Sequence, residues 1–366
     1  MLNTLFIERA GGWFLHSGIQ EPDGGVARFY RVDTGGNARV STEITGYAVS
    51  AFVLLFRLTG EAAYLAAAVR AGRFLLQRAW DARLSIFPFE WSNNGHLPEP
   101  YAYFFDSGII CRGLLALYRA TGDRAWLEGA VAGGRSMVRD FLAAADGVGA
   151  IPPILVLPEK RPLAFEPRWS REPGCYQLKS AMAWLDLDRE TGGNEFGRYY
   201  DVVLAASLRT HLQFLEAAAT REGVMDRLHA YCYFLEALLV SYGIPEVRLA
   251  LADGIAAAAR HLRELEPLFV RSDVYAQLLR VRLYADALGV VALDREAAAQ
   301  EAAAAAAFQV DSADRRQHGG FCFGRKGSRS LPFVNPVSTA FCLQALSNWE
   351  QRLSGGSPAA DIADLV

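Results

Sequence analysis

The 366-residue sequence predicts an all-α fold, an (α/α)6 toroid or barrel of six helical hairpins with inner and outer rings. The main observation is an internal repeat, in which a polar cluster opens an apolar stretch of about four turns that stops at a glycine. At about 1.5 Å per residue, each stretch is a helix of roughly 22 Å whose polar end is the N-terminus. The repeats run from Glu43 to Gly60, Asp106 to Gly122, Gln177 to Gly192, His229 to Gly243, Asp273 to Gly289 and Ser338 to Gly355.

Two kinds of helix alternate along the chain. The inner helices are apolar on nearly every face, which indicates burial all round, and are expected near 44–59, 107–121, 176–190, 227–242, 273–288 and 336–352. The outer helices are amphipathic and are expected near 62–79, 124–144, 195–217, 246–264 and 294–308, with an N-terminal helix near 2–16 as the sixth. Glycine at a helix end followed by an acid, as in Gly60-Glu61, suits the tight turns between them. Strands are expected only near 26–32 and 320–324, as a small β-hairpin.

The repeat, the net charge and the cysteines limit the domain organisation, partners and location that we expect for this protein. The repeat favours a single domain over 1–366, with a flexible tail near 354–366. A net charge of -3 gives no reason to expect nucleic acid as a partner, and no segment has the length and apolarity of a membrane span. The five cysteines are scattered without a C-x-x-C pair, so we expect reduced thiols, a cytoplasmic location and no zinc site. No sequence motif predicts another metal or a cofactor, and the oligomeric state is left open.

Acids at the inner-helix openings are the candidate catalytic groups. Glu43, Asp106 and Asp273 would meet at one rim, and paired carboxylates are what glycosidic cleavage requires, one as proton donor and one as base or nucleophile. The alternative is that these acids only cap their helices. His229 follows Asp226 by three residues on one helical face, so the carboxylate could orient the imidazole as a general base, or the histidine could be structural.

Candidate binding residues come from the same openings and from the loops that feed them. Aromatic side chains can stack on a pyranose, amides can bind its hydroxyls, and arginines between residues 158 and 174 could clamp a carboxylate. The alternative for the aromatic residues is that they only cover the end of the core. The alternative for the arginines is that they form a solvated charge cluster. The candidates are Tyr47, Trp91, Tyr103, Arg168, Trp169, Gln177, Tyr231, Gln277 and Asn335, with Asn93, Asn94 and His96 in the long loop and Arg325, Lys326 and Arg329 near the C-terminus.

The inner-helix openings resemble those of the six-hairpin glycosidase-like superfamily. They are STEITGY from Ser41, YFFDSGI from Tyr103, DRLHAY from Asp226, RSDVYAQ from Arg271 and NPVSTAF from Asn335. This resemblance implies a toroid that binds an oligosaccharide or a uronic-acid-containing sugar, since the group includes unsaturated uronyl hydrolases, sugar 2-epimerases, glycoside hydrolases and polysaccharide lyases. The chain is also similar to bacterial toroid proteins encoded with exopolysaccharide biosynthesis genes. Histidines transfer the proton in the epimerases, which would give that role to His229.

Three functional hypotheses follow. The first is glycoside hydrolysis by paired carboxylates, with lyase or epimerase chemistry by His229 and Tyr47 or Tyr231 as the alternative within enzymes. The second is a non-catalytic glycan-binding protein of a polysaccharide assembly system. The third, a terpenoid cyclase-like toroid, lacks the required acidic motif, because Asp186-Leu187-Asp188 lies late in its helix.

Overall fold

A computed structural model describes residues 5–91, 100–145, 150–166, 168–218, 220–266, 268–356 and 361–366. Asn93, Asn94 and His96 lie outside this described part. The described residues form two compact units. Unit 2 comprises residues 20–28 and 38–210, and unit 1 comprises residues 1–19, 29–37 and 211–366. The expectation of a single domain over 1–366 stays a prediction.

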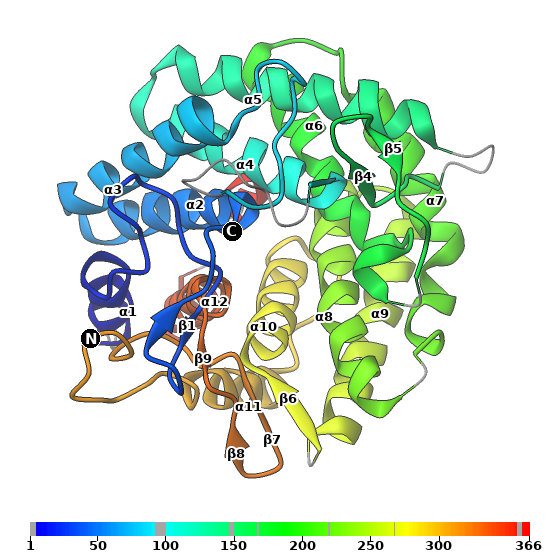
Figure 1. Ribbon diagram of the computed structural model, residues 1–366. Coiled ribbons are helices and arrows are strands. Elements are labelled where there is room, and N and C mark those ends of the chain that lie inside the picture. Colours follow the sequence, from blue (N-terminus) through cyan, green and yellow to red (C-terminus); the bar gives the residue numbers. More distant parts are fainter. Residues whose placement is uncertain are drawn as a thin grey trace. The chain divides into compact units, whose positions relative to one another are not determined.

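Unit 2 is built on three buried helices, α2 (Thr42–Thr59), α4 (Phe104–Thr121) and α6 (Leu178–Thr191). Figure 1 shows α2 and α4 side by side. An amphipathic helix covers each of these two: α3 (Ala62–Phe74), which continues as a π-helical turn over Leu75–Ala79, packs on α2, and α5 (Arg124–Ser136) packs on α4. The predicted glycine stops are confirmed here, because Gly60, Gly122 and Gly192 cap the buried helices at φ values of 75°, 72° and 66°. Helix α7 (Gly197–Glu216) starts in unit 2, and its residues from 211 onward belong to unit 1.

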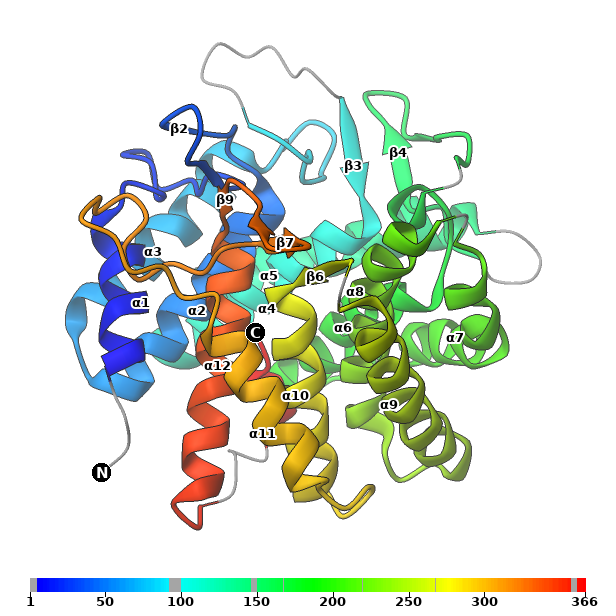
Figure 2. The same cartoon turned by 90° about the horizontal axis from the view of Figure 1, so that it is seen from below.

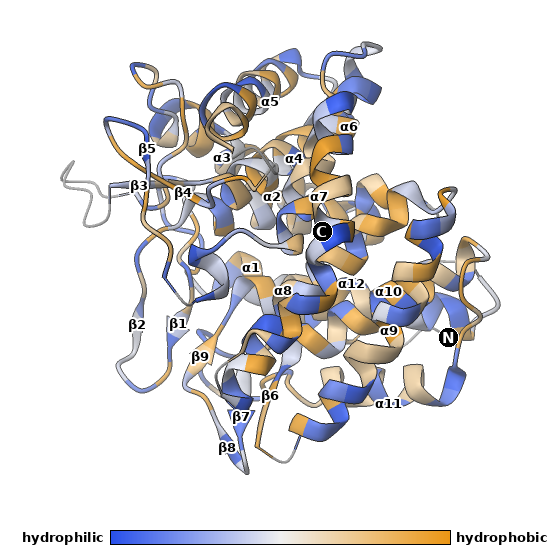
Figure 3. Cartoon of the chain, turned by 90° about the vertical axis from the view of Figure 1, so that its right-hand side faces the viewer, coloured by the Kyte–Doolittle hydropathy of each residue, from blue (hydrophilic) through white to orange (hydrophobic). Residues whose placement is uncertain are grey.

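Unit 1 repeats the arrangement with α8 (Arg221–Leu238), α10 (Ser272–Ala287) and α12 (Pro336–Leu353) as its buried helices. Helix α9 (Pro245–Leu265) packs on α8, and α11 (Arg295–Ala306) packs on α10. The N-terminal helix α1 (Leu5–His16) packs on α12, as the sequence predicts. In Figure 3, α9 carries both hydrophilic and hydrophobic residues, in line with its amphipathic sequence.

Short antiparallel sheets lie at the starts of the buried helices. In unit 2, β3 (Tyr101–Tyr103) leads directly into α4 and pairs with β4 (Ile154–Val156), which pairs with β5 (Arg161–Pro162). In unit 1, β6 (Phe269–Arg271) leads into α10 and pairs with β7 (Gly324–Lys326), followed by β8 (Arg329–Ser330). A third sheet has the order β2 (Gly36–Asn37), β1 (Tyr30–Arg31), β9 (Phe333–Val334), and β9 precedes α12. Figure 2 shows β3 at one end of α4 and β6 at one end of α10.

Small residues let the buried helices of unit 2 approach closely. A Cβ added to Gly46 of α2 would lie 2.9 Å from the Cα of Ile110 on α4. A Cβ added to Gly108 of α4 would lie 2.4 Å from the main-chain oxygen of Ser180 on α6. Since real Cβ atoms do not come so near, glycine is required at both positions. Gly46 and Gly108 lie within one turn of Glu43 and Asp106. The contact at Gly46 brings the two acid-bearing helices α2 and α4 together, and the contact at Gly108 holds the start of α4 against α6.

Four details of the sequence-based expectation need correction. Helix α8 ends before Gly243, through a 3-10 turn at Leu239–Ser241, and Gly243 does not take a positive φ. The tail near 354–366 is not free over its last six residues: Ile362–Asp364 form a 3-10 turn, and Arg280 donates to the main-chain oxygen of Val366 at 3.1 Å. The strand expected at 320–324 begins at the end of that range. The strands β3, β4 and β6 were not expected, because three-residue strands carry too little alternation to be recognised.

Among the helices described, none combines the length and the apolar character that crossing a membrane would take.

Candidate active site

A cavity of about 270 Å³ opens in unit 2 beside the first turns of α2 and α4. Five of the predicted site residues line it, namely Glu43, Tyr103, Asp106, Arg168 and Trp169. Ligand sites are typically concave, with aromatic walls and a few polar groups, and their volumes start at roughly 300 Å³. The cavity therefore suits a small ligand such as one sugar ring.

Glu43 and Asp106 form the acidic floor of this cavity. The Asp106 side chain is buried, with 4% of the residue exposed, and its Oδ2 has no hydrogen-bond partner among the described residues. Burial raises the pKa of Asp106 well above its usual value, and the neighbouring Glu43 raises it further. Burial likewise raises the pKa of Glu43 to about 7. Burial therefore favours the protonated form of Asp106, while Glu43, which is less subject to this effect, can lose its proton near neutral pH.

Arg28 limits how far these pKa values rise. Its positive charge lowers the pKa of both Glu43 and Asp106, against the larger effect of burial. The Nη1 of Arg28 donates to Oε1 of Glu90 at 3.1 Å, and the Nε of Arg39 lies 2.8 Å from Oε2 of the same carboxylate. Because Glu90 is buried, with 2% exposed, it holds Arg28 at the cavity wall.

Aromatic rings form the rest of the wall. Phe89 and Tyr103 lie 4.9 Å apart between ring centroids, and the Arg28 guanidinium stands over the Phe89 ring at 5.1 Å. On another side Trp169 meets Tyr176 edge to face at 5.2 Å. Trp169 begins a 3-10 turn, Trp169–Arg171, that follows β5 along the chain. Such rings give a pyranose flat apolar faces to stack on.

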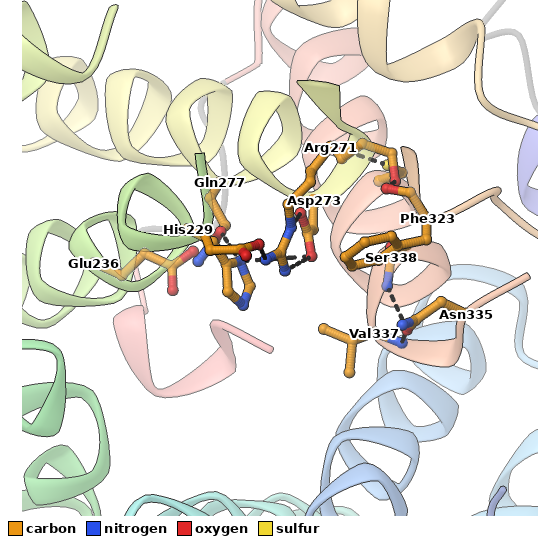
Figure 4. Close-up of polar contacts among 12 residues, drawn as sticks. His229, Glu236, Arg271, Asp273, Gln277, Phe323, Asn335, Val337 and Ser338 are labelled. Atoms are coloured by element: carbon orange, nitrogen blue, oxygen red, sulfur yellow. Dashed lines mark hydrogen bonds and ion pairs between the residues drawn. The ribbon is translucent and has the colours of Figure 1, made fainter. Parts of the chain in front are cut away.

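A second polar cluster lies in unit 1, at the start of α10 (Figure 4). Arg271, the last residue of β6, donates from Nε and Nη2 to the two carboxylate oxygens of Asp273, at 3.0 and 2.7 Å. Its Nη1 donates to Oδ1 of Asp226 on α8 at 2.9 Å. Burial alone would raise the pKa of Asp273, but Arg271 and then His229 lower it, so this carboxylate is ionised. Asp273 is thus an arginine partner in unit 1, whereas Glu43 and Asp106 line the cavity of unit 2.

His229 has a different partner from the one its sequence suggests. The expectation that Asp226 orients the imidazole is wrong, because that carboxylate turns to Arg271 instead. Nδ1 of His229 lies 2.8 Å from Oε1 of Gln277 on α10 and 3.5 Å from Oδ2 of Asp273, as Figure 4 shows. Because the amide oxygen accepts, Nδ1 carries the proton and Nε2 the lone pair. Burial and then the charge of Arg271 lower the pKa of His229 to about 4, so the imidazole is neutral at pH 7.

The remaining predicted binding residues lie outside the cavity lining. Gln177 fixes a loop, since its Oε1 accepts from the Gly174 N–H at 3.1 Å and its Nε2 donates to the Ile151 carbonyl at 3.0 Å. Asn335 caps α12, where its Oδ1 accepts from the N–H of Val337 at 2.7 Å.

The predicted aromatic residues outside the lining are packed into each unit. Tyr231 is buried, with its hydroxyl 3.1 Å from Nδ1 of His211. Tyr47 is buried within α2. Trp91 meets Phe74 edge to face at 6.0 Å.

Three other groups singled out in the sequence also have structural roles. Asp186 pairs with Arg112 of α4 at 2.9 Å, and Asp188 accepts from the N–H groups of Phe196 and Gly197 before α7. In the basic C-terminal hairpin, Nζ of Lys326 lies 2.5 Å from Oε2 of Glu222 and forms an ion pair with it. The contacts of these residues therefore stabilise the fold.

Sequence reasoning missed Arg28, Phe105, Tyr176 and Arg271. Phe105 and Tyr176 directly adjoin the predicted Asp106 and Gln177, so closer attention to neighbours would have found them. An arginine two residues before an acid at a helix start is a local signal for Arg271. Arg28 has no such signal, because its partner Glu90 is 62 residues away.

Within the described ranges, no group of three or more His, Cys, Asp or Glu side chains is arranged to hold a metal ion.

No protein-family model matches the sequence, and no curated protein matches it either. Among solved structures, cellobiose 2-epimerase from Spirochaeta thermophila is similar, with a TM-score of 0.69 and 17% identity over 94% of this chain and 96% of the other. A sugar epimerase from a ruminal bacterium gives a TM-score of 0.68 and 10% identity over 94% and 97%. An unsaturated glucuronyl hydrolase specific for heparin gives 0.64 and 12% over 97% and 98%. These likenesses confirm the predicted fold: the chain has the (α/α)6 toroid fold that these structures share.

Proposed function

We propose that this protein is a carbohydrate-active enzyme whose acid–base pair is Asp106 and Glu43. The observation that carries the proposal is the pairing of two carboxyl groups with raised pKa values in one small, aromatic-walled cavity. Perturbed pKa values of this kind cluster at functional sites. The names of the similar structures, two sugar epimerases and a glucuronyl hydrolase, support a sugar as the ligand.

Hydrolysis of a glycosidic bond is the reaction that this pair supports best. Asp106, buried and protonated, would give its proton to the glycosidic oxygen as the bond from that oxygen to the anomeric carbon breaks. Glu43, ionised, would take a proton from the water that forms the new bond to the anomeric carbon, or would attack that carbon itself. In the first case the two carboxyl groups exchange protonation states, and solvent restores them. In the second case the ionised Asp106 would take a proton from a water that attacks the anomeric carbon, the bond to Glu43 would break, and both carboxyl groups would return to their starting states.

The direct test is to replace each acid by its amide. We expect Asp106→Asn and Glu43→Gln each to lower kcat/KM by about 10²- to 10⁴-fold, the usual contribution of a positioned acid or base. Asp273→Asn and Asp226→Asn are the matched controls in the other polar cluster. Release of reducing ends from a panel of neutral and acidic oligosaccharides is the measurement. Full activity in both cavity variants would reject the assignment.

Proton abstraction from a sugar is a second candidate function, favoured by the neutral, lone-pair-bearing imidazole of His229. A base of this kind removes the proton next to the carbonyl of an open-chain sugar, and an acid returns a proton to the opposite face. Cellobiose incubated in D2O would then gain deuterium at C2, which NMR detects. Loss of exchange in His229→Gln, with exchange retained in Asp106→Asn, would select this reaction over hydrolysis.

Binding without catalysis, in a polysaccharide assembly system, is the remaining alternative. It predicts that the wild-type protein binds an oligosaccharide of the panel, while neither bond cleavage nor deuterium exchange follows. Isothermal titration calorimetry on the same panel separates this outcome from the two enzymatic ones.

A further inference from the structure

Three arginines line the acidic cavity, and two of them already have an acidic partner. Arg28 donates to Glu90 at 3.1 Å. Arg171 donates from Nη1 to Oε1 of Glu166 at 2.8 Å. For Arg168 the described part of the chain provides no acidic partner, although its side chain is exposed and lines the same cavity.

The charge balance of the cavity favours an anionic ligand. Glu90 is shared by Arg28 and by Arg39, which stands behind the lining, so one surplus positive charge remains beside that wall. Arg168 adds a second. Glu43 and Asp106 oppose them with about one negative charge when Asp106 is protonated. A ligand with one negative charge would therefore complete the balance.

The main chain at Arg168 is well fixed for such a contact. Its N–H donates to the Glu166 carbonyl at 2.6 Å, and its own carbonyl accepts from the N–H of Arg171 at 2.8 Å. The next residue, Trp169, presents its ring to the cavity and is held edge to face against Tyr176. A guanidinium beside an aromatic wall suits a sugar ring that stacks on the wall and carries a carboxylate at its edge, because the planar fork of arginine binds carboxylates with two hydrogen bonds.

We propose that Arg168 selects a uronic-acid sugar by binding the sugar carboxylate at the mouth of the cavity. This inference rests on the proposed function, in which Asp106 and Glu43 act on the same sugar. It assigns Arg168 to substrate recognition and leaves proton transfer to the two acids.

The test compares sugars that differ only at C6. The probes are methyl β-D-glucuronide and methyl β-D-glucoside, together with the corresponding galactose pair, titrated calorimetrically into the full chain. We expect the wild-type protein to bind a uronide at least about tenfold more tightly than its neutral counterpart, since a hydrogen bond to a charged group contributes about 1.5–3 kcal/mol. In Arg168→Ala the ratio of uronide affinity to neutral-sugar affinity should fall to about one. In wild type the same ratio should decrease as salt is added, because the site is exposed and salt screens its charge.

Arg161→Ala is the matched control. Arg161 lies in the same loop region, on the exposed strand β5, and does not line the cavity. Its removal changes the net charge equally but should leave the preference intact. Equal binding of the acidic and neutral sugars by wild type, or a preference that survives Arg168→Ala, would overturn the inference.

The outcomes also separate this inference from the proposed function. If neutral sugars bind and are cleaved in an Asp106-dependent way without a uronide preference, the function stands and the role of Arg168 is rejected. If uronides bind through Arg168 but neither acid variant affects turnover, recognition stands and the catalytic assignment fails. If no sugar binds to wild type, both are rejected.

Discussion

Asp106 and Asp273 both lie in the first turn of a buried helix, yet their surroundings give them opposite protonation. Asp106 faces Glu43 in a cavity, and burial raises its pKa well above the usual value. Asp273 receives two hydrogen bonds from Arg271, and its pKa is lowered although the side chain is equally buried. Position in the fold therefore does not decide the chemistry of an acid; the charge of its nearest neighbour does.

The largest expected effect is loss of stability when the arginine of unit 1 is removed. Arg271→Ala would leave the buried carboxylate of Asp273 unpaired, so we expect the free energy of unfolding to fall by about 3–5 kcal/mol. The comparison is Asp106→Asn, which replaces a protonated acid by an amide of the same shape and should change stability by less than about 1 kcal/mol. Urea denaturation followed by circular dichroism measures both. Similar losses in the two variants would contradict the distinction drawn between the clusters.

The next effect concerns the close helix contacts beside Glu43 and Asp106, α2 on α4 at Gly46 and α4 on α6 at Gly108. Gly46→Ala and Gly108→Ala would each place a Cβ under 3.0 Å from a neighbouring helix. We expect each to cost about 1–3 kcal/mol of stability, typical of overpacking, and to reduce activity by moving the acids. Gly12→Ala is the control, because a Cβ there meets nothing within 4 Å and alanine favours a helix. Unchanged stability and activity in both variants would show that the close approach does not set the site.

The two clusters should respond to pH with opposite sign. The pKa of Glu43 is raised from 4.5 to about 7, so the free energy of unfolding of wild type falls as pH rises through this range. The pKa of His229 is lowered from 6.5 to about 4, so stability is lost as pH falls between those values. Each effect should reach about 1–3 kcal/mol, given roughly 1.4 kcal/mol per pKa unit.

Single variants isolate these two pH effects. Relative to wild type, Glu43→Gln should gain stability between pH 5 and pH 8, whereas His229→Gln should gain it as pH falls from 6.5 to 4. Chemical denaturation at a series of pH values provides the comparison. If both variants differ from wild type with the same sign of pH dependence, one of the two protonation states is assigned wrongly.

The smallest effect is expected from the arginine that moderates the acid pair. Arg28→Ala should raise the pKa values of Glu43 and Asp106 and move both limbs of the kcat/KM profile to higher pH. The shift should stay below about one unit, because the Arg28 side chain is 40% exposed and solvent screens its charge. Arg39→Ala, which removes the other partner of Glu90, should leave the profile in place. A profile shift toward lower pH in Arg28→Ala would contradict the electrostatic role given to this residue.

More of the fold than of the candidate site could be predicted from the sequence. Helix ranges follow from local periodicity and from stops such as Gly60 and Gly122, whose φ values of 75° and 72° only glycine adopts easily. The acids Glu43 and Asp106 were recognised because they open such helices. Their protonation was not predictable, since it depends on burial and on Arg28. The partner of His229 is Gln277, which is 48 residues away, so no local pattern could show it.

The pairing of β3 with β4 has a consequence for how this protein could acquire new specificities. Tyr103 in β3 immediately precedes α4, and the register of the pair sets it opposite Ile154. The segment that follows β4 carries Arg168 and Trp169. A replacement loop grafted after residue 156 would therefore start from a fixed anchor and would leave the helix that carries Asp106 undisturbed. Substrate preference and bond-breaking chemistry could then evolve, or be engineered, as separable modules.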